Sequence, residues 1–169
     1  MAIFNLRPYQ VEGKTEIRKS FGENMKRVIF CSPTGSGKTV TFADIARETV
    51  KNGFKVMIVV DRKELLDQAK EKLTEYGLNP TLITAGRTGR SGAKSYIATV
   101  QTLVRRELPP VDLIVIDEAH KQIFDKILER PEYKDIYVIG ATATPKRTGK
   151  MNQLSKNYDK LVETITISE

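Results

Sequence analysis

The sequence contains one cysteine and one histidine, so it offers neither a disulfide framework nor the ligand set of a zinc site. Cys31 lies in the apolar run 28–31, where a small buried core residue is its expected role. No run approaches the roughly 18 apolar residues that a membrane span needs. The first residues also lack a basic segment followed by an apolar one. An intracellular, cytoplasmic protein with no membrane partner is therefore expected.

The composition predicts one globular domain with a basic surface. The 169 residues are about one domain long, and 40% of them are hydrophobic, which is enough for a single core. The formal net charge is +7, so the surface should attract the phosphates of a nucleotide or of a nucleic acid. No repeat, low-complexity tract or interdomain linker interrupts the chain, and residues 1–169 are expected to form a single domain.

Apolar runs alternate with stretches of helical spacing along the chain. The expected strands are 28–32, 56–60, 81–84, 95–99, 113–117 and 136–140. Helical spacing covers 42–49, 66–76 and 123–128, a first helix is expected from Pro8 to about Ser20, and a last helix from Met151 to Leu161 precedes a possible strand at 163–168. This alternation predicts an α/β fold: a mostly parallel central sheet of six to seven strands, joined by right-handed crossovers, with helices on both faces.

A glycine-rich segment follows the first expected strand. Residues 32–39 read Ser-Pro-Thr-Gly-Ser-Gly-Lys-Thr and precede an expected amphipathic helix over 39–51. In such a unit the glycines let backbone N–H groups and the helix N-terminus point at phosphate oxygens. Lys38 would reach the β- and γ-phosphates of ATP, and the Thr39 hydroxyl would bind Mg²⁺. The expected nucleotide-binding residues here are Pro33, Thr34, Gly35, Ser36, Gly37, Lys38 and Thr39.

The pattern departs from the strict phosphate-binding loop at Ser32, where G-x-x-x-x-G-K-[ST] requires glycine. The alternative is a glycine-rich turn without chemical meaning. That alternative does not account for Lys38 and Thr39 at the required place after an expected strand.

Two adjacent carboxylates, Asp117 and Glu118, end another apolar run. At the carboxyl end of a strand, Asp117 would hold Mg²⁺, directly or through water, and Glu118 would orient and deprotonate the water that attacks the γ-phosphate. Solvated acids that cap the next helix are the alternative, which the neighbouring glycine-rich segment disfavours. The expected catalytic residues are Glu118, Asp117 and Lys38, and the expected metal ligands are Thr39 and Asp117.

The two segments together resemble motifs I and II of DEAD/DEAH-type superfamily 2 helicases, with Asp-Glu-Ala-His at 117–120. Further segments follow in the family's order. Residues 6–10 are similar to the segment in which this superfamily's glutamine reads adenine, 61–68 resemble motif Ia, 98–103 the next nucleic-acid-contacting motif, and 142–144 motif III. Over nearly its whole length the chain resembles the N-terminal RecA-like domain, the helicase ATP-binding domain.

The resemblance implies roles for further residues. Arg7 and Gln10 would bind ATP, although an ordinary polar residue in a first helical turn is equally compatible with Gln10. The implied nucleic-acid contacts are Arg62, Lys63, Gly86, Arg87, Thr99, Thr102 and Arg105, for which a solvated basic face is the alternative. His120, Thr142 and Thr144 would couple the ATP site to the nucleic acid, and the strand 136–140 is expected between those carrying Lys38 and Asp117. A plain transition from strand to turn before Pro145 is the alternative for the two threonines.

The run Ala-Gly-Arg-Thr-Gly-Arg at 85–90 looks like the arginine-rich motif VI of these helicases. Motif VI belongs to a second RecA-like domain, after motif III, whereas this run precedes Asp117. A basic surface loop is therefore expected, in which Gly86 and Arg87 touch a nucleic-acid backbone. Nothing after Pro145 is long enough for a second RecA-like domain, which the full-length protein is expected to supply.

The sequence thus predicts the ATP- and Mg²⁺-binding motor domain of a superfamily 2 helicase or translocase, an ATP hydrolase that moves on nucleic acid. DNA is favoured over RNA by resemblance alone. Two alternatives stay open: an ATP-gated nucleic-acid-binding module without efficient hydrolysis, and the translocating subunit of a restriction system. Without an arginine delivered by a second domain, the chain alone is expected to hydrolyse ATP weakly or not at all.

Overall fold

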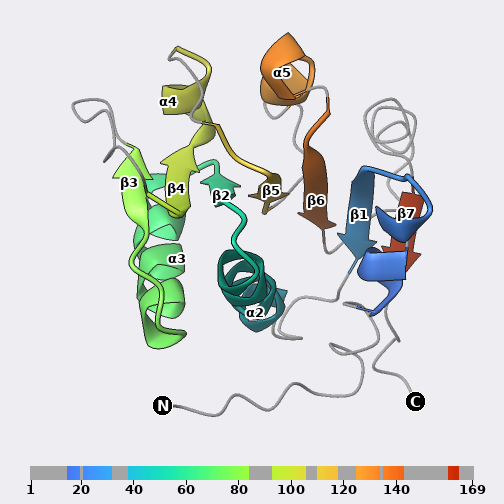
Figure 1. Cartoon of the computed structure of the whole chain (residues 1–169). Helices are drawn as coiled ribbons and strands as arrows, with labels where there is room; N and C mark the ends of the chain where they lie inside the picture. Colours follow the sequence, from blue (N-terminus) through green and yellow to red (C-terminus); the bar gives the residue numbers. More distant parts are fainter. Residues whose placement is uncertain are drawn as a thin grey trace, which may run out of the picture.

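A seven-stranded sheet with the order β3-β4-β2-β5-β6-β1-β7 forms the centre of the protein (Figure 1). The computed structural model describes residues 15–19, 21–31, 38–83, 93–105, 110–117, 125–133, 135–142 and 160–163. The strands are β1 (Arg27–Cys31), β2 (Val56–Val60), β3 (Thr81–Ile83), β4 (Ser95–Thr99), β5 (Leu113–Ile116), β6 (Tyr137–Thr142) and β7 (Lys160–Glu163). Every pairing between them is parallel, which confirms the expected α/β sheet.

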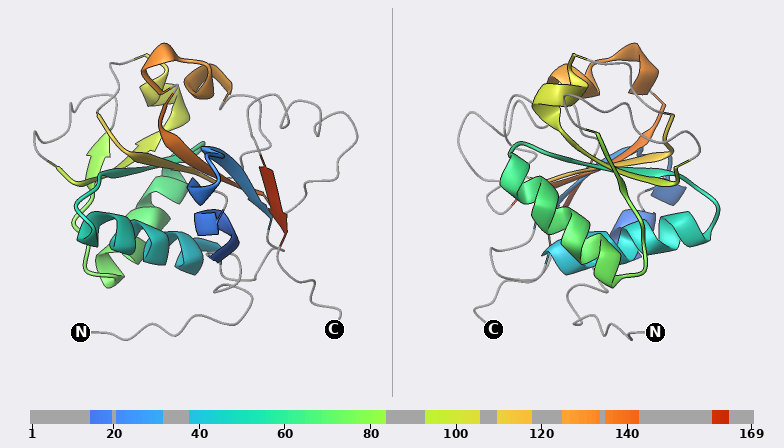
Figure 2. Two further views of the ribbon diagram at one scale, coloured as in Figure 1. Left: turned by 45° about the vertical axis from the view of Figure 1, so that its right-hand side comes forward. Right: turned by 90° about the vertical axis from the view of Figure 1, so that its left-hand side faces the viewer.

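Helices cover both faces of this sheet. They are α2 (Lys38–Lys51), α3 (Lys63–Glu75), α4 (Val100–Leu103), α5 (Asp125–Leu128) and the 3-10 turn η2 (Pro131–Tyr133), and residues 15–19 are also helical. Figure 2 shows α2 and α3 on one face and α4 and α5 on the other. The chain moves toward one edge through β1, β2 and β3 and then returns through β4, β5 and β6. Because right-handed crossovers change face when the direction reverses, the two sets of helices lie on opposite faces.

The sheet is buried on both faces, and its strands divide their side chains between two core layers. In β2, Val56 and Ile58 pack in the layer with α2 and α3, whereas Met57 and Val59 pack in the layer with α4 and α5. All five residues of β2 are buried. This explains why the strands read as continuous apolar runs in the sequence rather than as alternating ones.

Glycine ends α3 at a defined place. Gly77 has φ +85°, a backbone conformation that side chains with a Cβ rarely adopt. The Gly77 N–H donates to Thr74 O at 3.0 Å, and the Leu78 N–H donates to Leu73 O at 3.0 Å. This pair of bonds is the Schellman arrangement, which satisfies carbonyls that the helix leaves unpaired and directs the chain toward β3.

The C-terminal strand lies earlier than expected. The sequence predicted a helix from Met151 to Leu161 and a strand at 163–168, but Leu161 lies within β7, where it aligns in parallel with Ile29 of β1. Pairing with β1 is a long-range interaction, and it overrides the local helical spacing that placed Leu161 in a helix. Glu163, the first residue of the predicted strand, is the last residue of β7, and residues 151–159 and 164–168 lie outside the described residues. No helix in the described part of the chain is long and apolar enough to cross a membrane.

Replacing Leu73 with alanine should destabilise the protein. Leu73 lies on α3 and is 1% exposed, so its loss leaves a cavity against β2 and α2. The expected decrease in the free energy of unfolding is about 2–5 kcal/mol, measured by urea denaturation. Glu71→Ala is the matched control, because Glu71 is exposed on the same helix and should change stability by less than about 0.5 kcal/mol. Equal stability of the two variants would contradict the core assigned here.

Candidate functional site

The strands end at one edge of the sheet and bring together segments far apart in the sequence. Cys31 at the end of β1 is the register partner of Thr142 at the end of β6. Asp117 follows β5 directly, and its N–H donates to Val59 O of β2 at 3.3 Å. Thr99, the last residue of β4, is in register with Val60 of β2. Ligands of parallel α/β sheets bind at this carboxyl edge, so it is the candidate functional site.

The start of α2 belongs to this edge. β1 ends at Cys31 and α2 begins at Lys38, so residues 32–37 connect a central strand to the N-terminus of a 14-residue helix. The N–H groups of a first helical turn have no partner within the helix and carry partial positive charge, which favours an anion such as phosphate. Lys38 and Thr39 are the first two residues of that turn. The expected nucleotide-binding residues Pro33, Thr34, Gly35, Ser36 and Gly37 lie outside the described residues.

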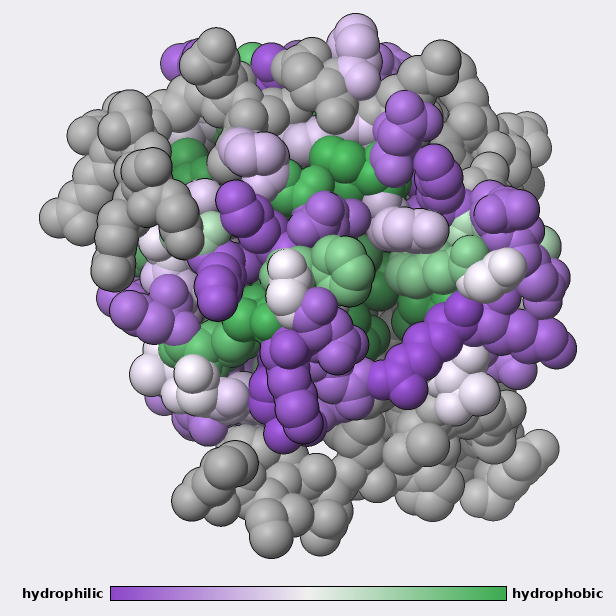
Figure 3. All heavy atoms as spheres, viewed as in Figure 1, coloured by the Kyte–Doolittle hydropathy of each residue, from purple (hydrophilic) through white to green (hydrophobic). Residues whose placement is uncertain are grey.

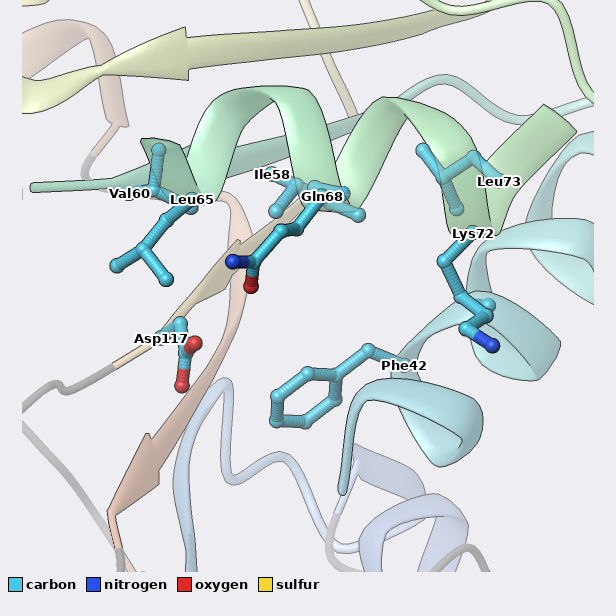
Figure 4. Close-up of a pocket in the computed structure, with 10 residues that line it drawn as sticks. Phe42, Ile58, Val60, Leu65, Gln68, Lys72, Leu73 and Asp117 are labelled. Atoms are coloured by element: carbon cyan, nitrogen blue, oxygen red, sulfur yellow. The ribbon is translucent and has the colours of Figure 1, made fainter. Parts of the chain in front are cut away.

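Asp117 is half-buried and opens onto a small hollow between α2 and α3. The hollow has a volume of about 50 Å³, and Phe42, Gln68 and Lys72 are among its other lining residues. Figure 4 shows the Asp117 carboxylate at the end of β5 and the Gln68 carboxamide on α3 pointing toward the same space. A carboxylate at this place can bind a cation or a water next to an anion held at the start of α2.

Arg47 of α2 contacts Tyr76, the residue that follows α3. Asp44 is buried on α2, and an Arg47 Nη2 lies 2.5 Å from its Oδ1. The same guanidinium lies over the ring of Tyr76, 6.0 Å from its centroid, at the end of α3. Burial, together with the negative charge of Asp44, raises the pKa of Tyr76 above its usual value. The two helices that begin at the carboxyl edge are thus packed as one layer.

The segments that begin α3 and α4 are held to each other. Gln101 Nε2 donates to Asp61 O at 2.8 Å, which joins the start of α4 to the turn before α3. At the same corner Thr99 Oγ1 donates to Thr102 Oγ1 at 2.9 Å. The corner therefore has a fixed arrangement rather than two independent loops.

Three of the predicted nucleic-acid contacts, Arg62, Lys63 and Arg105, are exposed near this corner. Arg62 and Lys63 begin α3, and Arg105 follows α4, so all three come from connections that leave the carboxyl ends of β2 and β4. The structure thus collects positive charge at the edge where Asp117 lies. Gly86 and Arg87 lie outside the described residues.

Gln101 and two arginines, Arg27 and Arg130, hold helices in place, although no functional role was predicted for them from the sequence. Arg130 Nη1 donates to Leu103 O at 3.1 Å, and Arg27 Nη2 donates to Leu128 O at 2.7 Å. These bonds fix the last turns of α4 and α5. Gln101 lies within the motif at 98–103, so the sequence could have indicated a role for it. Arg27 and Arg130 bind residues 101 and 27 positions away, so no local pattern could indicate them.

The expected place of β6 is confirmed, because the sheet order puts it between β5 and β1. Thr142 is its last residue, next to the end of β1. The remaining predicted site residues, Arg7, Gln10, Glu118, His120 and Thr144, lie outside the described residues, and their roles stay predictions. Within the described ranges no group of three or more His, Cys, Asp or Glu side chains could hold a metal ion by itself.

The chain is similar in sequence to a known protein family and to known helicases. The model of the family described as "Type III restriction enzyme, res subunit" matches residues 3–147. The "Putative ATP-dependent helicase IRC3" of Saccharomyces cerevisiae is 32% identical over 180 residues, an alignment that covers 93% of this chain and 26% of the yeast protein. The chain therefore spans about a quarter of the length of this relative.

Solved structures show the same fold. UvsW of bacteriophage T4 superposes with a TM-score of 0.78 at 20% identity, over 96% of this chain and 35% of UvsW. A nuclease-deletion mutant of the Type ISP restriction-modification enzyme LlaGI, in complex with a DNA substrate mimic, superposes with a TM-score of 0.73 at 20% identity. That match covers 97% of this chain and 20% of LlaGI. The predicted resemblance to the RecA-like domain of superfamily 2 helicases is confirmed by these similarities.

Gln101→Ala should loosen the corner between α3 and α4. The substitution removes the donor to Asp61 O while alanine keeps α4 favourable, and an exposed bond of this kind contributes about 0.5–1.5 kcal/mol. We expect faster hydrogen exchange at Leu65 and Leu66, whose N–H groups donate to Arg62 O in the first turn of α3. Lys70→Ala, exposed later on α3, is the control. Unchanged exchange at both amides would show that Gln101 does not hold the corner.

Proposed function

The chain belongs to the family described as type III restriction enzyme, res subunit, and from this premise we propose the function of the site. The chain is the ATP-binding motor domain of a longer superfamily 2 helicase or translocase, and that protein couples ATP hydrolysis to movement on nucleic acid. The observation that carries the proposal is the placement of Lys38, at the start of α2, and Asp117, after β5, at the same edge of the sheet. They follow β1 and β5, which flank β6.

ATP and Mg²⁺ fit the chemistry of this edge. A helix N-terminus suits phosphate, and the half-buried Asp117 carboxylate supplies oxygen ligands of the kind that Mg²⁺ prefers. Mg²⁺-ATP, when bound, supplies the reactive phosphoanhydride. Lys38 would contact its terminal phosphates, and Thr39 and Asp117 would hold the metal. Glu118 would orient and deprotonate the attacking water.

Nucleic acid, with DNA favoured over RNA, is the proposed track. The exposed side chains Arg62, Lys63 and Arg105 supply positive charge at the carboxyl edge, to which phosphates are attracted. Thr99 and Thr102, at the corner with Gln101, and the basic segment of Gly86 and Arg87 complete the proposed surface. The LlaGI structure holds a DNA substrate mimic, which supports the preference for DNA.

Coupling between ATP and DNA is assigned to His120, Thr142 and Thr144. β6 lies between the strand before Lys38 and the strand before Asp117, so a residue at its end can contact both sides of the nucleotide. α2 and α3 give a second connection, because they begin at Lys38 and Lys63 and the Arg47 guanidinium of α2 lies over the ring of Tyr76, which follows α3.

A second RecA-like domain is proposed to complete the motor in the full-length protein. Residues 1–169 would form one domain, and the chain spans 26% of its yeast relative, which leaves ample length for another. An arginine delivered by such a domain contributes about 10³ to 10⁵ in rate to related phosphoryl transfers. We therefore propose that the chain alone binds ATP weakly, hydrolyses it barely and unwinds nothing. A cytoplasmic location is proposed for the full-length protein.

A translocating subunit of a restriction system is the second candidate. The family description and the similarity to LlaGI favour it. Such a subunit has the same ATP-driven motor domain as a helicase, but the full-length protein that contains it differs in what it does to DNA. ATP-dependent cleavage of plasmid DNA by the full-length protein would identify it, whereas strand separation or translocation without cleavage would identify a helicase or a remodelling translocase.

Lys38→Ala should abolish ATP binding, because it removes the main side-chain charge on the β- and γ-phosphates. Glu118→Gln in the full-length protein should keep ATP affinity and lose hydrolysis, because only the base is removed. ATP affinity is measured by isothermal titration and turnover by phosphate release with DNA present. Lys70→Ala is the charge-matched control for Lys38→Ala, since Lys70 is exposed on α3.

The assignment of the ATP site is wrong if Lys38→Ala binds ATP with unchanged affinity. Full ATP turnover by Glu118→Gln would show that Glu118 is not the catalytic base. Robust turnover by the 169-residue chain, absent from its Glu118→Gln variant, would overturn the proposal that a second domain is needed.

Charge reversal at Arg62 or Arg105 should weaken DNA binding while ATP affinity is unchanged. Each phosphate contact contributes about 0.9 to the slope of log affinity against log salt for duplex DNA, so each variant should lower the slope by about that amount. Fluorescence anisotropy with labelled DNA between low and moderate salt measures it. Arg18→Glu is the matched control, because Arg18 is an exposed arginine on the helical segment 15–19, away from the carboxyl edge. An equal loss of DNA affinity in all three variants would show that binding depends on the net charge of the protein and not on these positions.

A further inference from the structure

A second hollowed surface lies at the opposite edge of the sheet, where the strands begin. Two adjoining hollows of about 320 and 220 Å³ share Phe21, Thr49, Phe54 and Leu113 in their linings, and we name them together the amino-edge groove. Figure 3 looks onto this edge and shows hydrophobic surface across its middle with hydrophilic residues around it. The proposed motor site is at the other ends of the strands, so it does not account for the groove.

Aromatic side chains give the groove its apolar character. Phe54 is 52% exposed and Tyr137 is 38% exposed, and they are the large hydrophobic side chains that stand out as exposed among those described. Both line the larger hollow. Phe21 packs against Tyr137 with ring centroids 4.7 Å apart. Single exposed apolar residues are ordinary, but several gathered in one concave surface mark a binding site.

The backbone holds these side chains in place without a ligand. Gly53, with φ +87°, ends α2 in a Schellman arrangement in which the Phe54 N–H donates to Thr49 O at 3.0 Å. The Tyr137 N–H donates to Asp112 O at 3.3 Å, which ties the start of β6 to the turn before β5. A surface that is already ordered loses little conformational entropy when a partner binds.

The groove is acidic on a basic protein. Among its lining residues Glu48, Asp112 and Asp135 stand against Arg18, which leaves the lining with net charge −2 while the whole chain carries +7. The Asp135 side chain is 85% exposed, and its pair with Lys26 is long, at 3.8 Å. Exposed pairs of this kind contribute little, so the carboxylate still attracts a second cation.

The charges also restrict what can bind here. Asp112 uses Oδ2 to accept the Lys55 N–H at 2.8 Å and is exposed on the same side as Tyr137. Carboxylates at the rim repel nucleic acid and favour a cationic partner. An apolar hollow of about 320 Å³ takes large side chains rather than a hydrated ion.

We propose that the amino-edge groove docks a protein segment that presents an arginine or lysine next to a large apolar side chain. The apolar side chain enters the larger hollow between Phe54 and Leu113. The cationic group lies over the Tyr137 ring and beside Asp112 and Asp135, where ring face and carboxylates attract it together. Aromatic anchors of this kind carry most of the energy at protein interfaces. The inference is independent of the ATP and DNA roles.

Two synthetic peptides test the groove. One is acetyl-Ser-Leu-Arg-Phe-Arg-Ser-amide, and the other has Glu in place of both Arg residues. Each is titrated into the isotope-labelled chain and followed by amide chemical shifts. We expect the arginine peptide to shift the amides of Phe54, Asp112 and Tyr137 and to leave Arg62 and Arg105 unchanged. The glutamate peptide should bind at least about tenfold more weakly, because both of its charges meet acidic side chains.

Variants separate docking from folding. Phe54→Ser should lower the affinity for the arginine peptide about tenfold or more, and Asp135→Asn should lower it about threefold. Both residues are exposed, so the thermal midpoint should stay close to that of the unmodified chain. Asp67→Asn is the control for charge, because Asp67 is exposed on α3 and does not line the groove.

Several results would overturn the proposal. Equal affinity of the two peptides for the chain would show that charge does not select the partner. Equal affinity of the arginine peptide for the Phe54→Ser variant and for the unmodified chain would show that the hollow does not select it. A duplex DNA oligonucleotide that shifts the groove amides would make the surface a nucleic-acid site. Sedimentation that shows a dimer dissolved by Phe54→Ser would make the occupant a second copy of the chain.

Discussion

The parallel register of β5, β6 and β1 is the constraint on which the rest of the structure depends. It aligns Ile116 with Gly140 and Cys31 with Thr142, so three connections leave the sheet at one edge. A one-residue slip of any of these strands would turn its buried side chains to the wrong core layer, and each strand is buried on both faces. The core therefore keeps the strands in register, and the register places Asp117 beside α2, where it lines one hollow with Phe42.

The helices extend this constraint to the surface. α2 and α3 both begin at the carboxyl edge and end at the amino edge, and the contact of Arg47 with Tyr76 joins α2 to the end of α3. We propose that the packing of α2 against α3 transmits a movement at the start of α2 to the start of α3. The Gln101 bond to Asp61 would extend this movement to α4. Nucleotide and nucleic acid are thereby proposed to act on one packed layer.

The two edges of the sheet differ in charge and in chemistry. The carboxyl edge combines a helix N-terminus with exposed arginine and lysine side chains, which suits phosphates. The amino edge combines exposed aromatic rings with acidic side chains, which suits a cationic and apolar protein segment. A net charge of +7 conceals this division, because it sums over both edges.

The sequence by itself determined the α/β class, the six strands from β1 to β6 to within two residues at their ends, and the motifs that resemble a superfamily 2 helicase. Continuous apolar runs and glycine-lysine spacing are local signals, so they can be recognised without a structure. Only the tertiary structure decided what depends on distant pairing. It placed Leu161 in a strand beside β1 rather than in a helix, gave Arg27 and Arg130 their carbonyl partners, and joined Gln101 to Asp61. It also gathered Phe21, Phe54 and Tyr137 into one groove, because residues more than 80 positions apart meet only when β6 is laid into the sheet.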